Sequence, residues 1–397
     1  MSDNGTPFAG ARLLVLAASI NQLPIIRRAR ELGCTVLTAD NQPQNIGHAL
    51  ADESFTVDTR NTDAIVALAR ENKIDGVIAA ATDVALPSAA AVGAALGLRA
   101  PSPEAAQALV PKDAFRRLQR ELGLPSPFAT DSPGYVEGNG PFVVKPVVGS
   151  GSRGIRIVEA HESLDDAFQE AQKLSLNGKA IIERFLPGTQ HSLEGILSGG
   201  LIRSCMVTDR LTAPPPFTAT RGHRAPSALP PSACANVVEQ IQKVFNYLEY
   251  RDGPFDADIV STPQGPVIIE LTPRAGGNAL MRLIEAATGS DHVMYLIANA
   301  LGMDVSSFED FKICPAGVEI LGSPRPGILT YNVGAISALK HESWCHYLAL
   351  DLPSGSPVSA FSDGRARFGE LIVTGRDRKS VDLHIEEALA RLELSVS

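Results

Sequence analysis

The stretch PFVVKPVVGSGSRGIRIV, residues 141–158, decides how the middle of this chain folds. An apolar run, Phe142–Val148, leads into the glycine-rich stretch Gly149–Gly154, and Ile155–Val158 then reads as a second strand. A dinucleotide-binding glycine motif opens a helix, so a strand after the glycines argues against NAD binding. A glycine loop between two strands can instead fold over polyphosphate with its backbone N–H groups. For the loop alone, an ordinary glycine hairpin is the simpler alternative.

Lys145 favours the phosphate interpretation. It lies inside the apolar strand Phe142–Val148, a few residues before the glycines. A lysine that faces a core needs an anionic partner, because burying an unpaired ammonium is costly, and phosphate oxygens would serve. Lys112 begins a predicted helix, Lys112–Leu122, and could reach the same phosphates across a cleft. Taken alone, Lys112 would be a solvated lysine at a helix start.

The first hundred residues or so alternate buried strands with helices. The predicted strands are Arg12–Ala18, Thr35–Ala39 and Gly76–Ala81, and the predicted helices are Leu23–Leu32 and Asp63–Glu71. This alternation predicts a parallel sheet covered on both faces. Ligands of such sheets bind beyond the carboxyl ends of the strands, where Asp40 and Asp83 stand, although both are equally well placed to cap helices.

After this part the pattern changes to an α+β arrangement. Predicted strands are Ala180–Phe185, Leu193–Leu197, Leu201–Thr208, Ala257–Ser261, Pro266–Leu271 and Arg367–Thr374, with helices over Ser163–Leu174 and Cys234–Leu248. Thr212–Pro231 is rich in proline, alanine and glycine without a clear period, which predicts a long mobile loop.

Two carboxylates mark a second candidate site. Asp258 lies in one predicted strand, and Glu270 ends the next, after an apolar run. A turn at Pro263–Gly265 would pair these strands and bring both acids to one end of a sheet. Carboxylates on adjacent strands suit Mg²⁺ when phosphate oxygens complete its octahedron. The alternative is a pair of exposed acids on an edge strand.

Composition excludes several classes of function. The chain has 397 residues, which predicts two to four domains, and a net charge of −9, which argues against nucleic acid or an anionic membrane as a partner. Five scattered cysteines without a CxxC pair argue against a disulfide framework or a structural zinc site. No stretch is long and apolar enough for a membrane span, and the N-terminus lacks a signal-peptide pattern. We therefore expect a cytoplasmic enzyme, with a homodimer as the common oligomeric state.

Together these stretches resemble the ATP-grasp superfamily over about residues 12 to 394. The resemblance is carried by Lys112 with FRRLQRELGLPSP, by residues 141–158, by IIERFLPGTQHSLEG (181–195), by GPFDADIVSTPQGPVIIELTPRAGGN (253–278) and by SAFSDGRARFGELIV (359–373). It is similar to the carboxylate–amine ligase type, including amino-acid ligases and the branch of the carbamoyl-phosphate synthase large chain. This implies an N-terminal doubly wound parallel-sheet domain (1–105), a small α+β lid (106–190), a C-terminal antiparallel sheet with the metal site (191–305) and a C-terminal subdomain packed on the core (306–397).

The resemblance also implies roles for individual residues. ATP would be bound by Lys112, Lys145, the lid-loop residues Ser150, Gly151, Ser152 and Gly154, the adenine-hinge residues Glu183, Phe185 and Leu186, and Gln190 near the ribose. Asp258 and Glu270 would hold Mg²⁺ or Mn²⁺. Arg274 would bind the substrate carboxylate and acyl phosphate, with Gly276, Gly277 and Asn278 shaping the pocket, and His223 would lie in a loop, Thr220–Ser227, that covers the acceptor. Three positions depart from the usual pattern: Gln190 and Asp258 stand where glutamate is common, and Thr272 where asparagine is common.

The implied reaction is ATP-dependent amide formation. Lys145 and Arg274 would act directly on the reacting groups, and small-molecule carboxylate and amine substrates would react through an acyl phosphate, with an amino-acid-derived acid as the expected substrate. The alternatives are a bicarbonate- or carbamate-activating enzyme related to carboxylases, a non-catalytic nucleotide-binding protein, and a kinase that stops at phosphorylation. ADP release with and without candidate acids and amines separates them.

Overall fold

The N-terminal part of the chain forms the parallel sheet that its sequence predicts. Its strands are β1 (Arg12–Leu16), β2 (Thr35–Asp40), β3 (Glu53–Thr56) and β4 (Gly76–Ala79). In the computed structural model, which describes residues 7–136, 138, 140–160, 162–214, 218–305 and 312–397, these strands have the order β3-β2-β1-β4 and all pair in parallel. The apolar side chains of β1 are buried on both faces, because helices cover both sides of the sheet.

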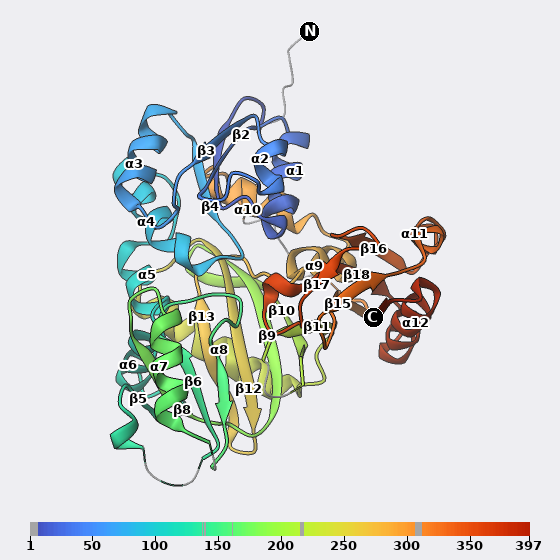
Figure 1. Cartoon of the computed structure of the whole chain (residues 1–397). Coiled ribbons are helices and arrows are strands. Elements are labelled where there is room, and N and C mark those ends of the chain that lie inside the picture. Colours follow the sequence, from blue (N-terminus) through green and yellow to red (C-terminus); the bar gives the residue numbers. More distant parts are fainter. Residues whose placement is uncertain (1–6, 137, 139, 161, 215–217, 306–311) are drawn as a thin grey trace.

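One of the covering helices comes from the other half of the chain. The N-terminal helices are α1 (Leu23–Glu31), α2 (Ile46–Leu50), α3 (Thr62–Glu71) and α4 (Leu86–Leu96), with 3-10 turns η1 (Ile20–Gln22) and η2 (Asp83–Ala85). Ile65 of α3 and Leu86 of α4 pack on one face. On the other face, Ile26 of α1 packs in one cluster with Ile297 of α10 (His292–Ala300) (Figure 1). This packing fixes the N-terminal sheet to the rest of the protein.

A small antiparallel sheet follows. Its strands are β5 (Ala129–Thr130), β6 (Phe142–Pro146), β7 (Arg156–Val158) and β8 (Ala180–Arg184), in the order β5-β8-β6-β7. Two helices, α5 (Pro103–Leu109) and α6 (Lys112–Glu121), lead into it, and η3 (Pro133–Tyr135) follows β5. Phe168 of α7 (Leu164–Leu174) packs against Val144 and Ile182 of the sheet.

The largest sheet has eight strands, each antiparallel to its neighbours. They are β9 (Thr189–Ser198), β10 (Leu201–Thr212), β11 (Thr220–Ala225), β12 (Gly253–Thr262), β13 (Gly265–Thr272), β14 (Ala316–Leu321), β16 (Cys345–Leu350) and β18 (Gly369–Thr374). Their order is β13-β12-β9-β10-β11-β14-β18-β16. Helix α8 (Pro231–Tyr247) covers one face of β9, β12 and β13, whereas α9 (Leu280–Thr288) packs against β14 and β18 (Figure 1).

The prediction of a long loop over Thr212–Pro231 is wrong at its centre, because Thr220–Ala225 forms β11. This strand lies inside the large sheet, where it pairs with β10 and β14. Its sequence, TRGHRA, lacks the apolar alternation that marks a strand, and a proline-rich segment precedes it. The two neighbouring strands supply the pairing that its own side chains do not indicate.

The last part of the chain continues the large sheet and adds a small sheet of its own. Strands β15 (Gly327–Thr330), β17 (Pro357–Val358) and β19 (Ser395–Val396) form a sheet in the order β17-β15-β19. The same part of the chain contains α11 (Val333–Lys340), η4 (Gly364–Ala366) and α12 (Arg378–Leu392), and α11 and α12 pack on strands of the large sheet. Strands β14, β16 and β18 share one sheet with β9 to β13. Within the described ranges, no helix has the length and apolar character that crossing a bilayer requires.

Candidate active site

One face of the large sheet carries the candidate site. Side chains alternate between the two faces of a strand, so residues of β12 divide into two sets. Phe255, Ala257 and Ile259 pack into the core beneath α8, and Asp256 and Asp258 therefore project from the opposite face. The same alternation on the neighbouring strands places polar side chains beside these acids.

Strand register aligns the polar side chains in two rows. In the first row, Asp258 lies opposite Glu270 of β13 on one side and Ser192 of β9 on the other. In the second row, Asp256 lies opposite Thr272 and Glu194. The pairing expected across the turn at Pro263–Gly265 is thus present, and Asp258 and Glu270 stand side by side.

These two carboxylates suit a hard divalent cation with help from a ligand. Their oxygens are the donors that Mg²⁺ prefers, and Mg²⁺ commonly uses one or two protein carboxylates together with substrate phosphates. Across the described parts of the chain, no group of three or more histidine, cysteine, aspartate or glutamate side chains is arranged to hold a metal. A cation held by Asp258 and Glu270 would therefore require further oxygens from phosphate or water.

Lys112 lies directly beside Glu270. Its Nζ is 3.1 Å from Glu270 Oε1, and its backbone N–H donates to the carbonyl of Val147 at the end of the glycine-loop strand. Burial opposes the charge on both side chains, but their attraction outweighs it, so the pKa of Lys112 is raised. The same attraction, with Lys145 and Arg274 adding to it, lowers the pKa of Glu270 to about 2. The structure therefore joins a proposed phosphate lysine to a proposed metal ligand.

Lys145 has the anionic partner that its buried position demands, and that partner is Glu183. Lys145 Nζ lies 2.7 Å from Glu183 Oε2, and Arg116 Nε lies 2.9 Å from Glu183 Oε1. All three side chains are buried. Burial lowers the pKa of Lys145, and the charges of Arg116 and Lys112 add to this effect while Glu183 opposes it. Glu183, which was expected at the adenine hinge, thus pairs with both Lys145 and Arg116 and holds these two side chains beside the small sheet.

The glycine loop contacts two distant segments. Ser152 Oγ lies 3.4 Å from the carbonyl oxygen of Thr218, to which it donates, and the Gly364 N–H donates to the carbonyl of Gly151 at 3.3 Å. Gly154 has a φ of +75°, and a Cβ there would come within 3.0 Å of Leu174 and Pro146, so glycine suits this position. The loop therefore lies between the small sheet and the C-terminal part of the protein.

Several predicted nucleotide residues lie outside the polar network. Within the part of the chain that the structure describes, no hydrogen bond joins Ser150, Phe185 or Leu186 to the charged side chains of the site. Phe185 follows the end of β8, and its N–H donates to the carbonyl of Pro141.

Arg274, just beyond β13, is held by two carboxylates. Its Nε and Nη2 lie 2.8 Å and 2.6 Å from Asp83 Oδ1, and its Nη1 donates to Asp256 Oδ2 at 2.9 Å and to the carbonyl of Ala275. Burial opposes its charge, but Asp83 and Asp256 outweigh that effect and raise its pKa. Four of its five N–H groups therefore have a partner, and the one left for a substrate oxygen is on Nη2.

The turn after Arg274 closes over the second acidic row. The Gly276 N–H donates to Glu194 Oε2 at 2.7 Å, and a Cβ at Gly276 would lie 2.4 Å from that oxygen. A larger residue at this position would require the Glu194 and Leu280 side chains to shift. Gly277 faces Ala81 of the N-terminal domain, and Asn278 has a φ of +53°. Burial raises the pKa of the neighbouring Asp256 well above its usual range, Arg274 opposes this, and Glu194 adds to it.

Arg210 is one of the site residues that the sequence analysis missed, together with Arg116 and Glu194. Arg210 projects from β10 onto the same face, with Nη1 3.1 Å from Asp258 Oδ2. The same Nη1 donates to Gln190 Oε1 at 3.1 Å, and Nε donates to Thr220 Oγ1 at 2.9 Å. The alternation of side chains along β10 could have indicated Arg210, because it lies two positions after Thr208 and therefore shares its face of the sheet, and Thr208 lies opposite Ser192 of the first row.

His223 lies in strand β11, and the expectation of a covering loop at Thr220–Ser227 is wrong for its first six residues. The imidazole is buried, its Nδ1 is 3.0 Å from Thr208 Oγ1, and its Nε2 has no hydrogen-bond partner among the described residues. Burial lowers its pKa to about 3, and the charges of Arg210 and Arg224 add to this effect. His223 is therefore neutral near pH 7.

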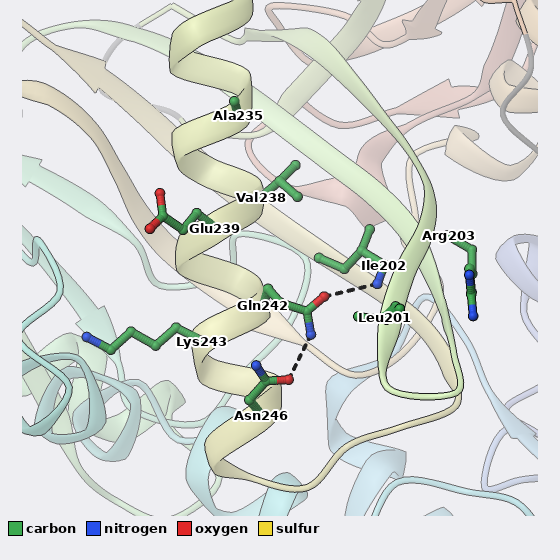
Figure 2. A pocket seen from close by; sticks show the side chains of 9 residues that line it. All are labelled: Leu201, Ile202, Arg203, Ala235, Val238, Glu239, Gln242, Lys243 and Asn246. Atoms are coloured by element: carbon green, nitrogen blue, oxygen red, sulfur yellow. Dashed lines mark hydrogen bonds between the residues drawn. The ribbon is translucent and has the colours of Figure 1, made fainter.

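A separate cavity of about 750 Å³ lies between α8 and the start of β10. Figure 2 shows the side chains that line it, among them Leu201, Val238, Gln242 and Lys243. It belongs to the α8 side of the sheet, and none of the site residues described above lines it.

Comparison with known proteins supports what the geometry indicates. The family described as the ATP-grasp domain matches residues 139–282. The chain is 26% identical over 387 residues to an uncharacterized protein of Sinorhizobium fredii, covering 94% of this chain and 79% of that protein. It is 28% identical to carnosine synthase 1 of Gallus gallus over 176 residues, covering 41% of this chain and 19% of that enzyme. It is 29% identical to the formate-dependent phosphoribosylglycinamide formyltransferase of Paraburkholderia xenovorans over 195 residues, covering 46% of this chain and 48% of that enzyme. The chain thus matches about a fifth of the first named enzyme and about half of the second.

Solved structures share the fold over almost the whole chain. The L-amino acid ligase of Bacillus licheniformis superposes with a TM-score of 0.79 at 18% identity, covering 98% of this chain and 99% of that one. The phosphoribosylglycinamide synthetase of Anaerococcus prevotii gives 0.78 at 18% identity, covering 98% and 100%. The family uses ATP and Mg²⁺, as in the MgADP complex of the biotin carboxylase domain of Hydrogenobacter thermophilus 2-oxoglutarate carboxylase (TM-score 0.76, 17% identity, covering 97% and 90%). The domain match over residues 139–282, together with the fold shared over almost the whole chain, shows that this chain belongs to the ATP-grasp superfamily.

Proposed function

We propose that this protein is an ADP-forming carboxylate–amine ligase. It would transfer the γ-phosphoryl group of ATP to a substrate carboxylate, and an amine nitrogen would then attack the acyl phosphate, expel phosphate and form an amide. An amino-acid-derived acid is the proposed carboxylate. The bicarbonate-activating, non-catalytic and kinase alternatives each predict a different dependence of ADP release on acid and amine.

The arrangement around Glu270 is the observation that carries this proposal. Lys112 and Lys145 are both buried, and both act on Glu270, through a contact of 3.1 Å for Lys112 and through charge for Lys145. Asp258 stands in register with Glu270 on the next strand. A surface that combines buried cations with paired carboxylates suits phosphate oxygens together with a hard cation, because each needs the other to balance its charge.

The residues would divide the work as follows. Lys112 and Lys145 would donate to phosphate oxygens and neutralise charge that develops during transfer. Asp258 and Glu270 would hold Mg²⁺ or Mn²⁺, and such a cation supplies charge neutralisation and alignment of phosphate oxygens when bound. The loop at Gly149–Gly154 would cover the nucleotide and keep water from the acyl phosphate.

Arg274 is proposed to bind the substrate carboxylate. Asp83 contacts its Nε and Nη2, and Asp256 accepts a hydrogen bond from its Nη1, so the guanidinium plane is fixed and one N–H of Nη2 is left for a substrate oxygen. A guanidinium held in this way can donate to a carboxylate oxygen without first losing the freedom of its long side chain. The turn with Gly276, Gly277 and Asn278 would shape the pocket beside it.

The names of the relatives fit a carboxylate substrate. They include an L-amino acid ligase among the structures and a formate-dependent formyltransferase among the sequences. For this chain the identity of the acid and of the amine, the homodimer, the cytoplasmic location and the domain boundaries stay predictions.

An ADP-release assay tests the proposal. Purified protein with MgATP is screened against amino acids and related acids, each with and without amine acceptors. We expect acid-stimulated ADP release that Lys145→Met lowers roughly 100-fold or more. Lys243→Met is the matched control, since Lys243 is exposed on α8 beside the separate cavity. Equal loss in both variants, or amide formation with AMP and pyrophosphate, would contradict the proposal.

A further inference from the structure

Arg210 is tied to the candidate metal carboxylate by a short ion pair. Its side chain is 11% exposed, and its Nη1 lies 3.1 Å from Asp258 Oδ2. Two neutral partners, Gln190 and Thr220, accept hydrogen bonds from its Nη1 and Nε. The guanidinium is therefore held at a fixed place on the sheet face, with Asp258 as its nearest anion.

Both oxygens of Asp258 are in use. Oδ2 contacts Arg210, and Oδ1 accepts a hydrogen bond from Ser192 Oγ at 2.7 Å. Glu270 likewise contacts Lys112 through Oε1. Each of the two proposed metal carboxylates thus has its own cation, and the four charges balance.

A divalent cation that binds Asp258 has to compete with Arg210. When the cation takes Asp258, Arg210 requires another anion, because a guanidinium without an anionic partner in a mostly buried site is costly. The triphosphate that would accompany the metal carries the anionic oxygens that Arg210 would then lack, and arginine suits phosphate because it presents several donors in one plane. Binding of the metal to Asp258 would therefore release Arg210 for phosphate. Binding of the nucleotide would supply the anion that Arg210 loses when the metal takes Asp258.

The position of Arg210 relative to the glycine loop supports this exchange. Its partner Thr220 begins β11, two residues after Thr218, whose carbonyl accepts the hydrogen bond from Ser152 of the loop. Arg210 is thereby joined through a short segment to the part of the chain proposed to cover the phosphates.

We propose that Arg210 is a phosphate-binding residue that pairs with Asp258 in the nucleotide-free protein and transfers to phosphate when a divalent cation takes that carboxylate. This inference rests on the proposed function, and it adds a residue and a coupling to it. Coupling of this kind is reciprocal: the metal strengthens nucleotide binding by the same factor by which the nucleotide strengthens metal binding.

Metal binding without nucleotide gives the first test, with Mn²⁺ as the probe in titration calorimetry or electron paramagnetic resonance. Arg210→Met removes the competing cation, so Mn²⁺ alone should bind roughly tenfold more tightly than in the wild type, which is about 1.4 kcal/mol. A merely structural role predicts unchanged or weaker binding. Arg203→Met is the matched control, because Arg203 is exposed at the other end of the same strand.

Nucleotide binding gives the second test. In EDTA, Arg210 stays paired with Asp258, so Arg210→Met should bind ADP and ATP about as well as the wild type does. With Mn²⁺ present the variant should bind them more weakly than the wild type, so its gain in nucleotide affinity on adding Mn²⁺ should be smaller, by about the factor seen in the metal titration. Arg210→Gln, which keeps hydrogen-bond donors but no charge, should give the same signs and serves if the methionine variant does not fold. Unchanged Mn²⁺ and nucleotide affinities in a folded variant would overturn the inference. A wild type that binds neither Mn²⁺ nor ATP would instead overturn the proposed function.

Discussion

Asp83 and Arg274 form a buried ion pair between the N-terminal domain and the large sheet. They are separated by 191 positions in sequence, yet Arg274 Nη2 lies 2.6 Å from Asp83 Oδ1. Asp83 stands in η2, beyond the carboxyl end of β4, where ligands of parallel sheets bind. The edge that the sequence marks as a ligand-binding edge therefore supplies the residue that orients the proposed carboxylate-binding arginine.

Asp83→Asn should weaken the use of the acid more than the use of ATP. The amide cannot balance the guanidinium charge, so Arg274 should be held less firmly and KM for the acid should rise roughly tenfold, with KM for ATP little changed. The free energy of unfolding should fall by about 1–3 kcal/mol, because Asp256 still pairs with Arg274. Steady-state kinetics and urea unfolding measure the two effects.

Asp40→Asn is the control for this prediction. Asp40 is also buried at a strand end of the same sheet, but it accepts hydrogen bonds from Ala18, Gln42 and Asn45 and does not touch Arg274. It should lower stability and leave the KM for the acid near the wild-type value. A matching rise in KM for both variants would assign the effect to general loss of stability.

Asp258→Asn and Glu270→Gln should both raise the Mg²⁺ concentration needed for activity, because each removes a negative oxygen ligand. Their effects on stability should differ. Glu270→Gln leaves the buried Lys112 without its nearest anion, which should lower the free energy of unfolding by about 1–2 kcal/mol after allowance for the partly exposed Glu270. Asp258→Asn leaves Arg210 its hydrogen bonds to Gln190 and Thr220, so it should cost less. Full activity of either variant in EDTA would contradict the prediction, because it would mean that the two carboxylates have a structural role and do not bind Mg²⁺.

His223 predicts a loss of stability in acid. Its pKa falls from about 6.5 to about 3 on folding. Between about pH 6.5 and pH 3, the imidazole is therefore protonated in the unfolded chain and neutral in the folded protein. The contribution of the neutral imidazole is complete above about pH 6.5 and is lost as the pH falls toward 3, at up to about 1.4 kcal/mol per pH unit. His223→Asn should therefore show a smaller decrease in unfolding free energy between about pH 7 and pH 4. Equal decreases in both proteins would mean that His223 is protonated in the folded state.

Much of the fold could be predicted from local sequence. The apolar runs of β1 and β2 and the strand before the glycines follow directly from side-chain pattern, as does the pairing of β12 with β13. Strand β11 could not be predicted this way, since its polar side chains serve the site and its neighbours supply its pairing. The packing of α10 against the N-terminal sheet also depends on contacts between distant segments, which no local pattern records.

The candidate site was predictable in its residue types and less so in its partnerships. Burial of Lys145 implied an anion, but the anion within the chain is Glu183, which arrives from a different strand. Likewise, the sequence predicts that Asp258 is a metal ligand but does not indicate that Arg210 forms an ion pair with it. Charged side chains find partners through tertiary structure, so their pairing follows from the fold rather than from spacing along the chain.

Trapping of the activated acid tests the central claim most directly. Wild-type protein is incubated with MgATP, a stimulating acid and hydroxylamine in place of the amine, and hydroxamate and ADP are measured together. The account predicts hydroxamate in proportion to ADP, dependent on the acid, and largely lost in Arg274→Lys, because an ammonium cannot reproduce the planar donors that match a carboxylate. ADP release without hydroxamate, or hydroxamate accompanied by AMP and pyrophosphate, would contradict it.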